Sequence, residues 1–256
     1  MKLLNIQNPF CAPIYHFDTV SSTMDVSKEL AQKEALHGTV ITADYQNSGR
    51  GRIKNRSWDM DTQKGLSFTI LLCFNNIETI PKALTLRIGL AVSYAIEDFE
   101  VCLKDRVFIK WPNDIIIDDK KAVGILCEAD GGKVHVGIGI NVAQDKFEHP
   151  LCEKATSIAL AANRSVELTE RFLLLEKVLE NIYKELKKPN EQNWKLRLEK
   201  RLYKIGKQVS FIEGAADSKK TIQGILTGIN DNGELLIMPN GETLSQAFFT
   251  GELRFC

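Results

Sequence analysis

Apolar residues along the chain follow both helical and strand spacing, which predicts a mixed α and β fold. Helical spacing, with apolar positions three and four residues apart, marks segments 21–35, 81–99, 168–188 and a shorter one around Trp194 and Leu198. Continuous or alternating apolar runs predict strands at 38–45, 65–73, 106–111, 115–118, 121–129 and 133–142. Because short turns separate the last four of these strands, we expect a meander of antiparallel hairpins.

Capping residues and prolines predict where the helices begin and end. Ser22 or Thr23 can accept hydrogen bonds from the free backbone amides at the start of the first helix. Pro81 suits the first turn of the second helix. Pro189 is expected to end the third, because proline cannot continue a helix.

The pattern changes near the carboxyl-terminal end, where short alternating strands are separated by the turn sequences DNG and NG. The expected strands lie within 207–214, 221–231, 233–239 and 242–255. A segment of this size and pattern predicts a small all-β barrel. We therefore expect two domains, a catalytic body at residues 1–205 and a barrel at residues 206–256.

Charge and composition argue against several classes of function. Lys plus Arg and Asp plus Glu both total 33, a balance that disfavours a nonspecific polyanion binder or a membrane-surface protein. No apolar stretch approaches the roughly eighteen residues of a membrane span and no signal sequence begins the chain, so we expect a cytoplasmic protein. The six cysteines lie far apart without metal-ligand spacing, so we expect reduced, mostly buried thiols and no metal held by the protein.

The segment QNSGRGRIKNRSW, residues 46–58, joins two expected strands and concentrates positive charge. Gly49 and Gly51 allow the backbone to wrap around a ligand, and Arg50 and Arg52 carry planar guanidinium groups suited to carboxylate or phosphate oxygens. We expect the segment to bind an anion and to become ordered when its charge is neutralised. The alternatives are a solvated hairpin tip and an RNA-binding sequence, the latter disfavoured by the single copy and the balanced net charge.

Two further stretches carry candidate binding residues. In IKWPNDIIID, Lys110 ends an apolar strand and can present a charge at the mouth of a sheet, although a plain surface lysine is the alternative. In VGIGIN, Gly137 and Gly139 leave room for a flat ligand, and Asn141 offers a donor and an acceptor. Neither the GxGxxG nor the Walker pattern occurs, which excludes the usual Rossmann and P-loop nucleotide sites.

In this order, the motifs resemble the biotin protein ligase family. The correspondence consists of SSTMD at 21–25, QNSGRGR at 46–52, KWPND at 110–114, KKAVGILCE at 120–128, VGIGIN at 136–141, ATSI at 155–158 and the terminal GELRF. The resemblance covers nearly the whole chain. It implies an α+β fold, with a class II synthetase-like catalytic domain of mixed or antiparallel sheet and flanking helices, followed by a small SH3-like β-barrel.

The resemblance implies a reaction in two steps. The biotin carboxylate attacks the α-phosphate of ATP with release of pyrophosphate, and the resulting biotinyl-5′-AMP acylates a lysine of a biotin carboxyl carrier domain, as in acetyl-CoA carboxylase. ATP and biotin are the implied substrates, with Mg²⁺ held mainly through the phosphates. A mobile cationic loop that closes over the adenylate would protect this mixed anhydride from water.

Position by position, the resemblance also implies the site residues. The implied biotin-binding residues are Ser22, Thr23, Met24, Gln46, Gly49, Arg50, Gly51, Arg52, Lys110 and Gly137. The implied ATP-binding residues are Arg52, Arg56, Trp58, Lys110 and Asn141. Catalysis is assigned to Lys110, Arg50 and Arg52, with Lys110 bridging the biotin carboxylate and the α-phosphate. Gly139 is expected to share the pocket floor with Gly137.

The sequence departs from the family pattern on the nucleotide side. GRGRIKNRSW is one residue longer than the usual pattern, so Arg56 and Trp58 are assigned to within one position. Cys256 stands where some relatives carry a basic residue. Because only about twenty residues precede SSTMD, we expect a monofunctional ligase without an N-terminal DNA-binding domain. A homodimer is compatible with the resemblance.

Two other functions fit parts of the pattern. A lipoate-type ligase shares the architecture and the adenylate chemistry but has to hold a longer, more flexible acyl chain. A noncatalytic protein could use the C-terminal β unit for protein or RNA contacts. The pair of motifs GRGR and KWPND favours biotin.

Overall fold

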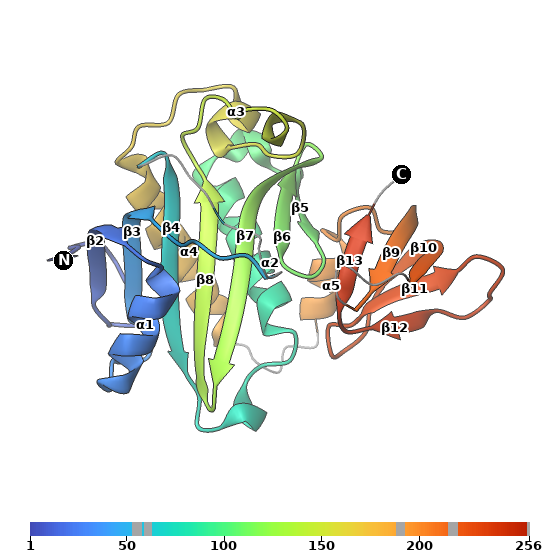
Figure 1. The fold of residues 1–256 in the computed structure, drawn as a ribbon, viewed down its shortest axis with the longest axis horizontal. Helices are drawn as coiled ribbons and strands as arrows, with labels where there is room; N and C mark the ends of the chain where they lie inside the picture. Colours follow the sequence, from blue (N-terminus) through green and yellow to red (C-terminus); the bar gives the residue numbers. More distant parts are fainter. Residues whose placement is uncertain (53–57, 59–62, 188–192, 215–219, 255–256) are drawn as a thin grey trace.

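The computed structural model describes residues 1–52, 58, 63–187, 193–214 and 220–254, called the described residues below. Its largest element is an eight-stranded sheet with the order β1-β2-β3-β4-β8-β7-β6-β5 (Figure 1). The strands are β1 (Lys2–Leu3), β2 (Ile14–Val20), β3 (Val40–Gln46), β4 (Gly65–Cys73), β5 (Val107–Lys110), β6 (Asp114–Ile117), β7 (Lys120–Asp130) and β8 (Lys133–Asn141). Only β2 and β3 pair in parallel among these strands, and β5 to β8 form the expected antiparallel meander.

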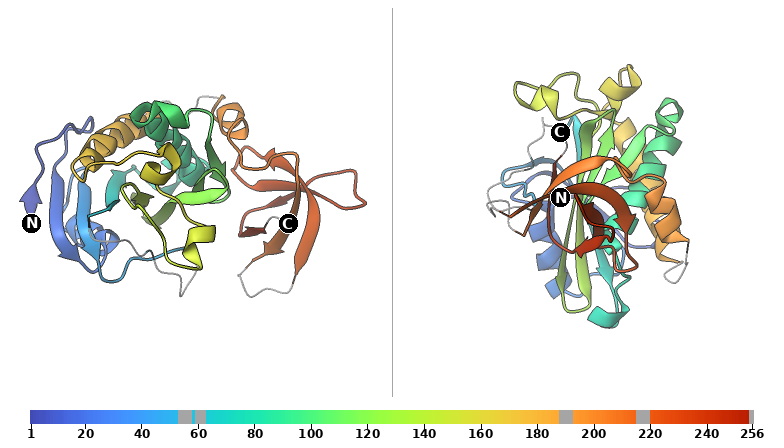
Figure 2. Two further views of the ribbon diagram at one scale, coloured as in Figure 1. Left: turned by 90° about the horizontal axis from the view of Figure 1, so that it is seen from above. Right: turned by 90° about the vertical axis from the view of Figure 1, so that its right-hand side faces the viewer.

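Helices cover both faces of this sheet. They are α1 (Thr23–Gln32), α2 (Leu84–Phe99), α3 (Ile158–Ala162), α4 (Glu170–Leu186) and α5 (Trp194–Glu199), with 3₁₀ turns η1 (Ile77–Thr79), η2 (Val101–Leu103) and η3 (Leu151–Glu153). α1 lies on β3, β4 and β8, whereas α2 and α4 pack side by side on the opposite face (Figures 1 and 2). β4 is therefore covered on both faces, which explains its nearly continuous apolar sequence.

The main core fills the space between the sheet and the pair α2 and α4. Leu174, Val178 and Ile182 of α4 are spaced by four residues and are completely buried in it. α2 is buried more widely than one helical face, because a second apolar cluster contacts its other side through Leu86 and Leu90. The helix thus serves two cores.

The carboxyl-terminal strands form a separate five-stranded antiparallel sheet with the order β12-β11-β10-β9-β13. Its strands are β9 (Gln208–Glu213), β10 (Thr221–Ile229), β11 (Leu235–Pro239), β12 (Gln246–Phe248) and β13 (Gly251–Arg254). The expected β unit is confirmed. In the described residues the sheet is open, with β12 and β13 at its edges, so the SH3-like barrel stays a prediction.

A shared apolar cluster joins the two sheets. Phe211 and Leu226 of the smaller sheet pack in one cluster with Leu90 of α2 and Trp111, which follows β5. The Trp111 indole N–H also donates to the Gly233 carbonyl at 3.0 Å. The smaller sheet is thereby fixed against the end of the larger one, beside β5 (Figure 1).

A buried ion pair ties α2 to α4. Arg87 Nε donates to Glu185 Oε1 at 2.8 Å, and the two side chains are 1% and 5% exposed. Arg197 Nη2 donates to the other carboxylate oxygen of Glu185 at 2.9 Å. The Glu185 carboxylate therefore has a cationic partner at each oxygen, as a buried charge requires.

The structure corrects two expectations and adds elements that were not predicted. α2 begins at Leu84 rather than Pro81, after Ala83 in a left-handed conformation with φ of 55°. Most cysteines are not fully buried, since Cys11 and Cys102 are exposed and Cys73, Cys127 and Cys152 are partly buried. The strand β2 and the short helix α3 were not predicted. Pro189 lies outside the described residues, and within them no helix is long and apolar enough to cross a membrane.

Candidate active site

A cavity of about 180 Å³ opens between the two sheets, in front of the strands β4, β7 and β8. The N-terminal turn of α1 forms one wall, and the turn between β5 and β6 forms another. Glu252 and Leu253 of β13 close the side toward the smaller sheet. The cavity is therefore built by elements from nearly the whole length of the chain.

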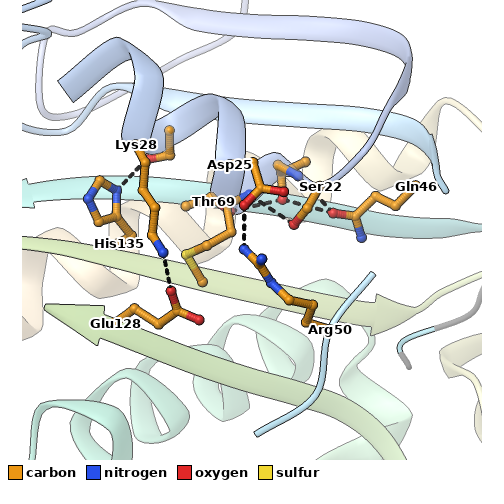
Figure 3. Close-up of polar contacts among 11 residues, drawn as sticks. Ser22, Asp25, Lys28, Gln46, Arg50, Thr69, Glu128 and His135 are labelled. Atoms are coloured by element: carbon orange, nitrogen blue, oxygen red, sulfur yellow. Dashed lines mark hydrogen bonds and ion pairs between the residues drawn. The ribbon is translucent and has the colours of Figure 1, made fainter. Parts of the chain in front are cut away.

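One end of the cavity is a hydrogen-bonded polar cluster. Ser22 caps α1, because its hydroxyl oxygen accepts from the backbone N–H of Met24 at 3.3 Å. The backbone N–H and the hydroxyl of Thr23 both donate to Gln46 Oε1, at 2.9 and 3.1 Å. Thr23 Oγ1 lies 2.8 Å from Thr69 Oγ1 (Figure 3). The residues at the capped start of α1 therefore place buried hydrogen-bond donors and acceptors at a fixed position at this end of the cavity.

Glycines form the floor. A Cβ on Gly139 would lie 2.2 Å from the Trp58 side chain, and a Cβ on Gly124 would lie 3.0 Å from it. A Cβ on Gly137 would lie 2.9 Å from the Met24 methyl. The absence of side chains at these three strand positions therefore lets flat groups lie against the backbone.

Trp58 lies on this floor. The Trp58 Nε1 is buried and has no hydrogen-bond partner among the described residues. A buried indole N–H normally finds an acceptor. The Trp58 indole therefore covers part of the glycine floor, with its Nε1 unsatisfied among the described residues.

Four cationic side chains of the described residues line the cavity. Arg50 Nη2 donates to Asp25 at 2.6 Å, and Arg52 Nη2 donates to the backbone carbonyl of Gly251 at 2.7 Å. Lys110 ends β5 and Lys121 lies at the start of β7, two strands of the meander that are separated by β6. Such a set suits a ligand that carries several anionic oxygens.

Lys121 was not among the residues predicted for the site. Its ammonium lies 2.6 Å from the Asp114 carboxylate and 5.5 Å from the centroid of the Trp58 ring. It also lies 3.3 Å from the position of a Cβ on Gly124. The structure therefore puts this lysine directly beside the glycine floor. Its place in the KKAVGILCE motif, three residues before Gly124, was the available sequence signal.

Most of the predicted residues meet in this one cavity. Those that line it are Ser22, Thr23, Met24, Gln46, Arg50, Gly51, Arg52, Trp58, Lys110, Gly137 and Gly139. Their roles toward a ligand stay predictions. Lining residues that were not predicted include Ser67, Thr69, Trp111, Asp114, Lys121 and Glu252.

Two predicted residues, Asn141 and Gly49, do not line the cavity. Asn141 is buried beyond the end of the floor, where its Nδ2 donates to the Thr156 carbonyl at 3.0 Å. Gly49 lies behind the lining residues, and its carbonyl accepts from the Trp58 N–H at 3.0 Å. Arg56 and Cys256 lie outside the described residues.

Among the described residues, His16, Asp18 and Asp44 place potential metal ligands within 4.8 Å of one another. Asp44 Oδ1 already accepts from Arg171 at 2.5 Å and lies 3.3 Å from His16 Nε2. Burial lowers the pKa of His16, while Asp44 acts in the opposite direction. The Arg171 guanidinium would repel a divalent cation, so the group is suited to an internal ion pair rather than to a metal.

Comparison with known proteins agrees with the geometry. The model of the biotin/lipoate A/B protein ligase family matches residues 16–145. The bifunctional ligase/repressor BirA of Bacillus subtilis is 34% identical over 235 residues, which cover 89% of this chain and 69% of that protein. A biotin acetyl-CoA-carboxylase ligase of Mycobacterium tuberculosis is 26% identical over 88% of this chain and 83% of its own.

Solved structures show the same fold. The biotin protein ligase of Aquifex aeolicus in complex with biotin and ATP has a TM-score of 0.75 and 30% identity, and the match covers 94% of this chain and 97% of that one. The extent of the family match and the identity to the Bacillus protein settle the classification. The chain belongs to the biotin/lipoate A/B protein ligase family.

Proposed function

We propose that the protein is an ATP-dependent biotin protein ligase that forms biotinyl-5′-AMP and transfers biotin to a lysine of a biotin carboxyl carrier domain. The observation that carries the proposal is the cavity itself, which combines a buried polar end, a glycine floor and four cationic side chains. The ureido group of biotin suits the polar end, its apolar ring and alkyl chain suit the glycine floor, and its carboxylate suits the cationic side chains. The names of the relatives that act on acetyl-CoA carboxylase support this carrier.

In the first step, a carboxylate oxygen of biotin forms a bond to the α-phosphorus of ATP, and the bond from that phosphorus to the bridging oxygen of pyrophosphate breaks. Both reactants are anions, so the barrier includes their mutual repulsion. Lys110, Lys121, Arg50 and Arg52 would reduce this repulsion and stabilise the charge on the α-phosphate in the transition state. Ser22, Thr23 and Gln46 would orient the ring system at the polar end.

In the second step, the amine of a carrier lysine attacks the acyl carbon, AMP leaves, and the amine loses its proton. The adenylate has to survive until the carrier arrives. Arg50 and Arg52 belong to the loop after β3, and Arg52 already contacts the backbone of β13 across the cavity. Closure of this loop would exclude water from the mixed anhydride.

Mg²⁺ would neutralise the phosphates of ATP. Asp114 and Glu252 are the carboxylates among the described lining residues, and Asp114 is paired with Lys121. This donor set fits an ion held mainly by the phosphates rather than a preformed protein site. We assign residues 1–205 to a catalytic domain and 206–256 to an SH3-like domain that contributes Glu252 and Leu253 to the cavity wall.

Exchange of labelled pyrophosphate into ATP tests the proposal. Biotin should support rapid exchange, because adenylate formation is reversible before the carrier binds, and lipoate should support little. Exchange with lipoate alone would identify a lipoate-type ligase instead. Exchange with neither acid would favour a noncatalytic binding protein.

Replacing Arg50 with alanine should accelerate the loss of bound biotinyl-AMP about 10-fold or more, because the loop loses a charged contact over the product. The measurement is a chase of labelled adenylate from the isolated enzyme without carrier. Arg106→Ala is a suitable control, because Arg106 pairs with Asp118 at the surface, outside the cavity. Retention equal to that of the wild type would rule out the proposed closure.

A further inference from the structure

The loop residue Arg50 is held by a carboxylate on helix α1. Its Nη2 donates to Asp25 Oδ1 at 2.6 Å, and Figure 3 shows the two side chains facing each other below the helix. Asp25 belongs to the first turn of α1, where a negative charge interacts favourably with the positive end of the helix dipole. The same turn carries Ser22 and Thr23, so the contact holds the guanidinium beside the polar end of the cavity.

The next arginine of the loop is held on the opposite wall. Arg52 donates to the Gly251 carbonyl of β13 at 2.7 Å, and the segment after β3 runs across the front of the sheet toward that strand (Figure 1). The Trp58 backbone N–H donates to the Gly49 carbonyl at 3.0 Å, so Trp58 lies beside the start of this segment. The described part of the loop, residues 47–52, therefore spans the cavity between two anchors, of which Asp25 is the one on α1.

The contact with Asp25 leaves Arg50 able to bind a ligand. A guanidinium has five N–H donors, and this ion pair uses a donor on Nη2. Arginine loses considerable rotamer freedom when it is fixed, and a partner that fixes it beforehand removes part of that cost from binding. Asp25 can thus hold the side chain in place while the remaining donors face an anionic oxygen.

We propose that Asp25 is a positioning residue that anchors the arginine-containing loop to α1 through Arg50 and keeps the loop closed over the bound adenylate. The proposal rests on the proposed function. The Arg50 and Asp25 side chains are 42% and 36% exposed, and ion pairs of this kind are weak. The expected effect is therefore a several-fold change in retention rather than loss of activity.

A double-mutant cycle tests the anchor. Asp25→Asn removes the charge with little change in size and should speed the loss of bound biotinyl-AMP about two- to five-fold. In an Arg50→Ala background the same substitution should change the rate by less than about 1.5-fold, because its partner is already absent. Asp25→Glu keeps the carboxylate and should restore much of the retention. A purely structural role for Asp25 would give equal effects in both backgrounds and would overturn the proposal.

The other ion pair of the same helix provides a matched control. Lys28 Nζ lies 2.5 Å from Glu128 Oε2, and these side chains are 42% and 34% exposed (Figure 3). Glu128 does not line the cavity. Glu128→Gln should leave adenylate retention unchanged, and a loss as large as that of Asp25→Asn would show that loosening α1, rather than releasing Arg50, causes the effect.

Limited proteolysis separates this proposal from the proposed function. Without any ligand, trypsin should cut after Arg52 about two- to five-fold faster in Asp25→Asn than in the wild type or in Glu128→Gln, because cleavage requires the loop to leave the cavity wall. If the wild type forms no adenylate, the proposed function is wrong, but this assay still shows whether Asp25 anchors Arg50. Equal cleavage rates in all three proteins would overturn it.

Discussion

Replacing Lys121 with alanine is expected to reduce the rate of biotinyl-AMP formation about 100- to 1,000-fold, the usual cost of removing one group that stabilises transition-state charge. The Lys121 ammonium lies beside the glycine floor, and Asp114 holds it there at 2.6 Å. Under the proposed function, alanine removes one of the positive charges that would stabilise the α-phosphate in the transition state. Pyrophosphate exchange at saturating ATP and biotin measures the loss directly.

The same assay compares Lys121 with Lys110, to which the sequence resemblance assigns the bridging role. Both lysines line the cavity, and Lys110→Ala is also expected to lower the rate by orders of magnitude if that assignment holds. Lys120→Ala is the control, because Lys120 donates to the Cys152 carbonyl and does not line the cavity. Wild-type exchange in Lys121→Ala would remove this lysine from the mechanism. A large loss at only one of the two positions would identify the bridging residue.

Replacing Glu185 with alanine should lower the free energy of unfolding by about 3–5 kcal/mol, because it removes a buried carboxylate that pairs with both Arg87 and Arg197. Arg87 is 1% exposed and makes a second contact with α4 through the Glu185 backbone carbonyl, at 3.2 Å. That carbonyl contact does not depend on the Glu185 side chain, so the substitution tests the carboxylate alone. Urea unfolding followed by circular dichroism measures the change.

Two further variants show whether burial of the Arg87–Glu185 ion pair causes the loss of stability. Glu180→Ala, on the same helix, removes an exposed pair with Lys184 and should change stability by no more than about 0.5 kcal/mol. Replacing Arg87 by methionine and Glu185 by leucine together should recover most of the loss, because well-packed apolar side chains can replace a buried ion pair. A loss below about 1 kcal/mol for Glu185→Ala would contradict the argument.

The sequence predicts best where local chemistry determines the structure. Ser22 caps α1 as expected, and the apolar run at 65–73 is a buried strand. The motifs that resemble the family bring Gln46, Lys110 and Gly137 into one cavity although they are far apart in the chain. Each of these predictions depends on a short segment whose sequence pattern strongly favours one local structure.

Predictions that depend on contacts between distant segments were weaker. Pro81 is a good first residue for a helix, but Ala83 adopts a left-handed conformation and its side chain lies against Gly233 of the C-terminal unit. Asn141 fits a binding site by chemistry, yet its amide is used to hold the Thr156 carbonyl. Lys121 enters the site because the strands β6 and β7 pair beside Trp58. The contacts of Ala83 and Asn141 have no signal in the local sequence, whereas the KKAVGILCE motif was the available signal for Lys121.

Truncation of the chain at residue 205 would expose the apolar side chains of Leu86, Leu90 and Ile109, which now share a cluster with the C-terminal sheet. It would also remove the Gly251 carbonyl that holds Arg52. The shortened protein is therefore expected to aggregate rather than remain folded as a smaller enzyme that loses its adenylate faster. Because so much apolar surface is shared, the two sheets should melt in one cooperative transition, and heat should open the reaction chamber only by unfolding the whole protein.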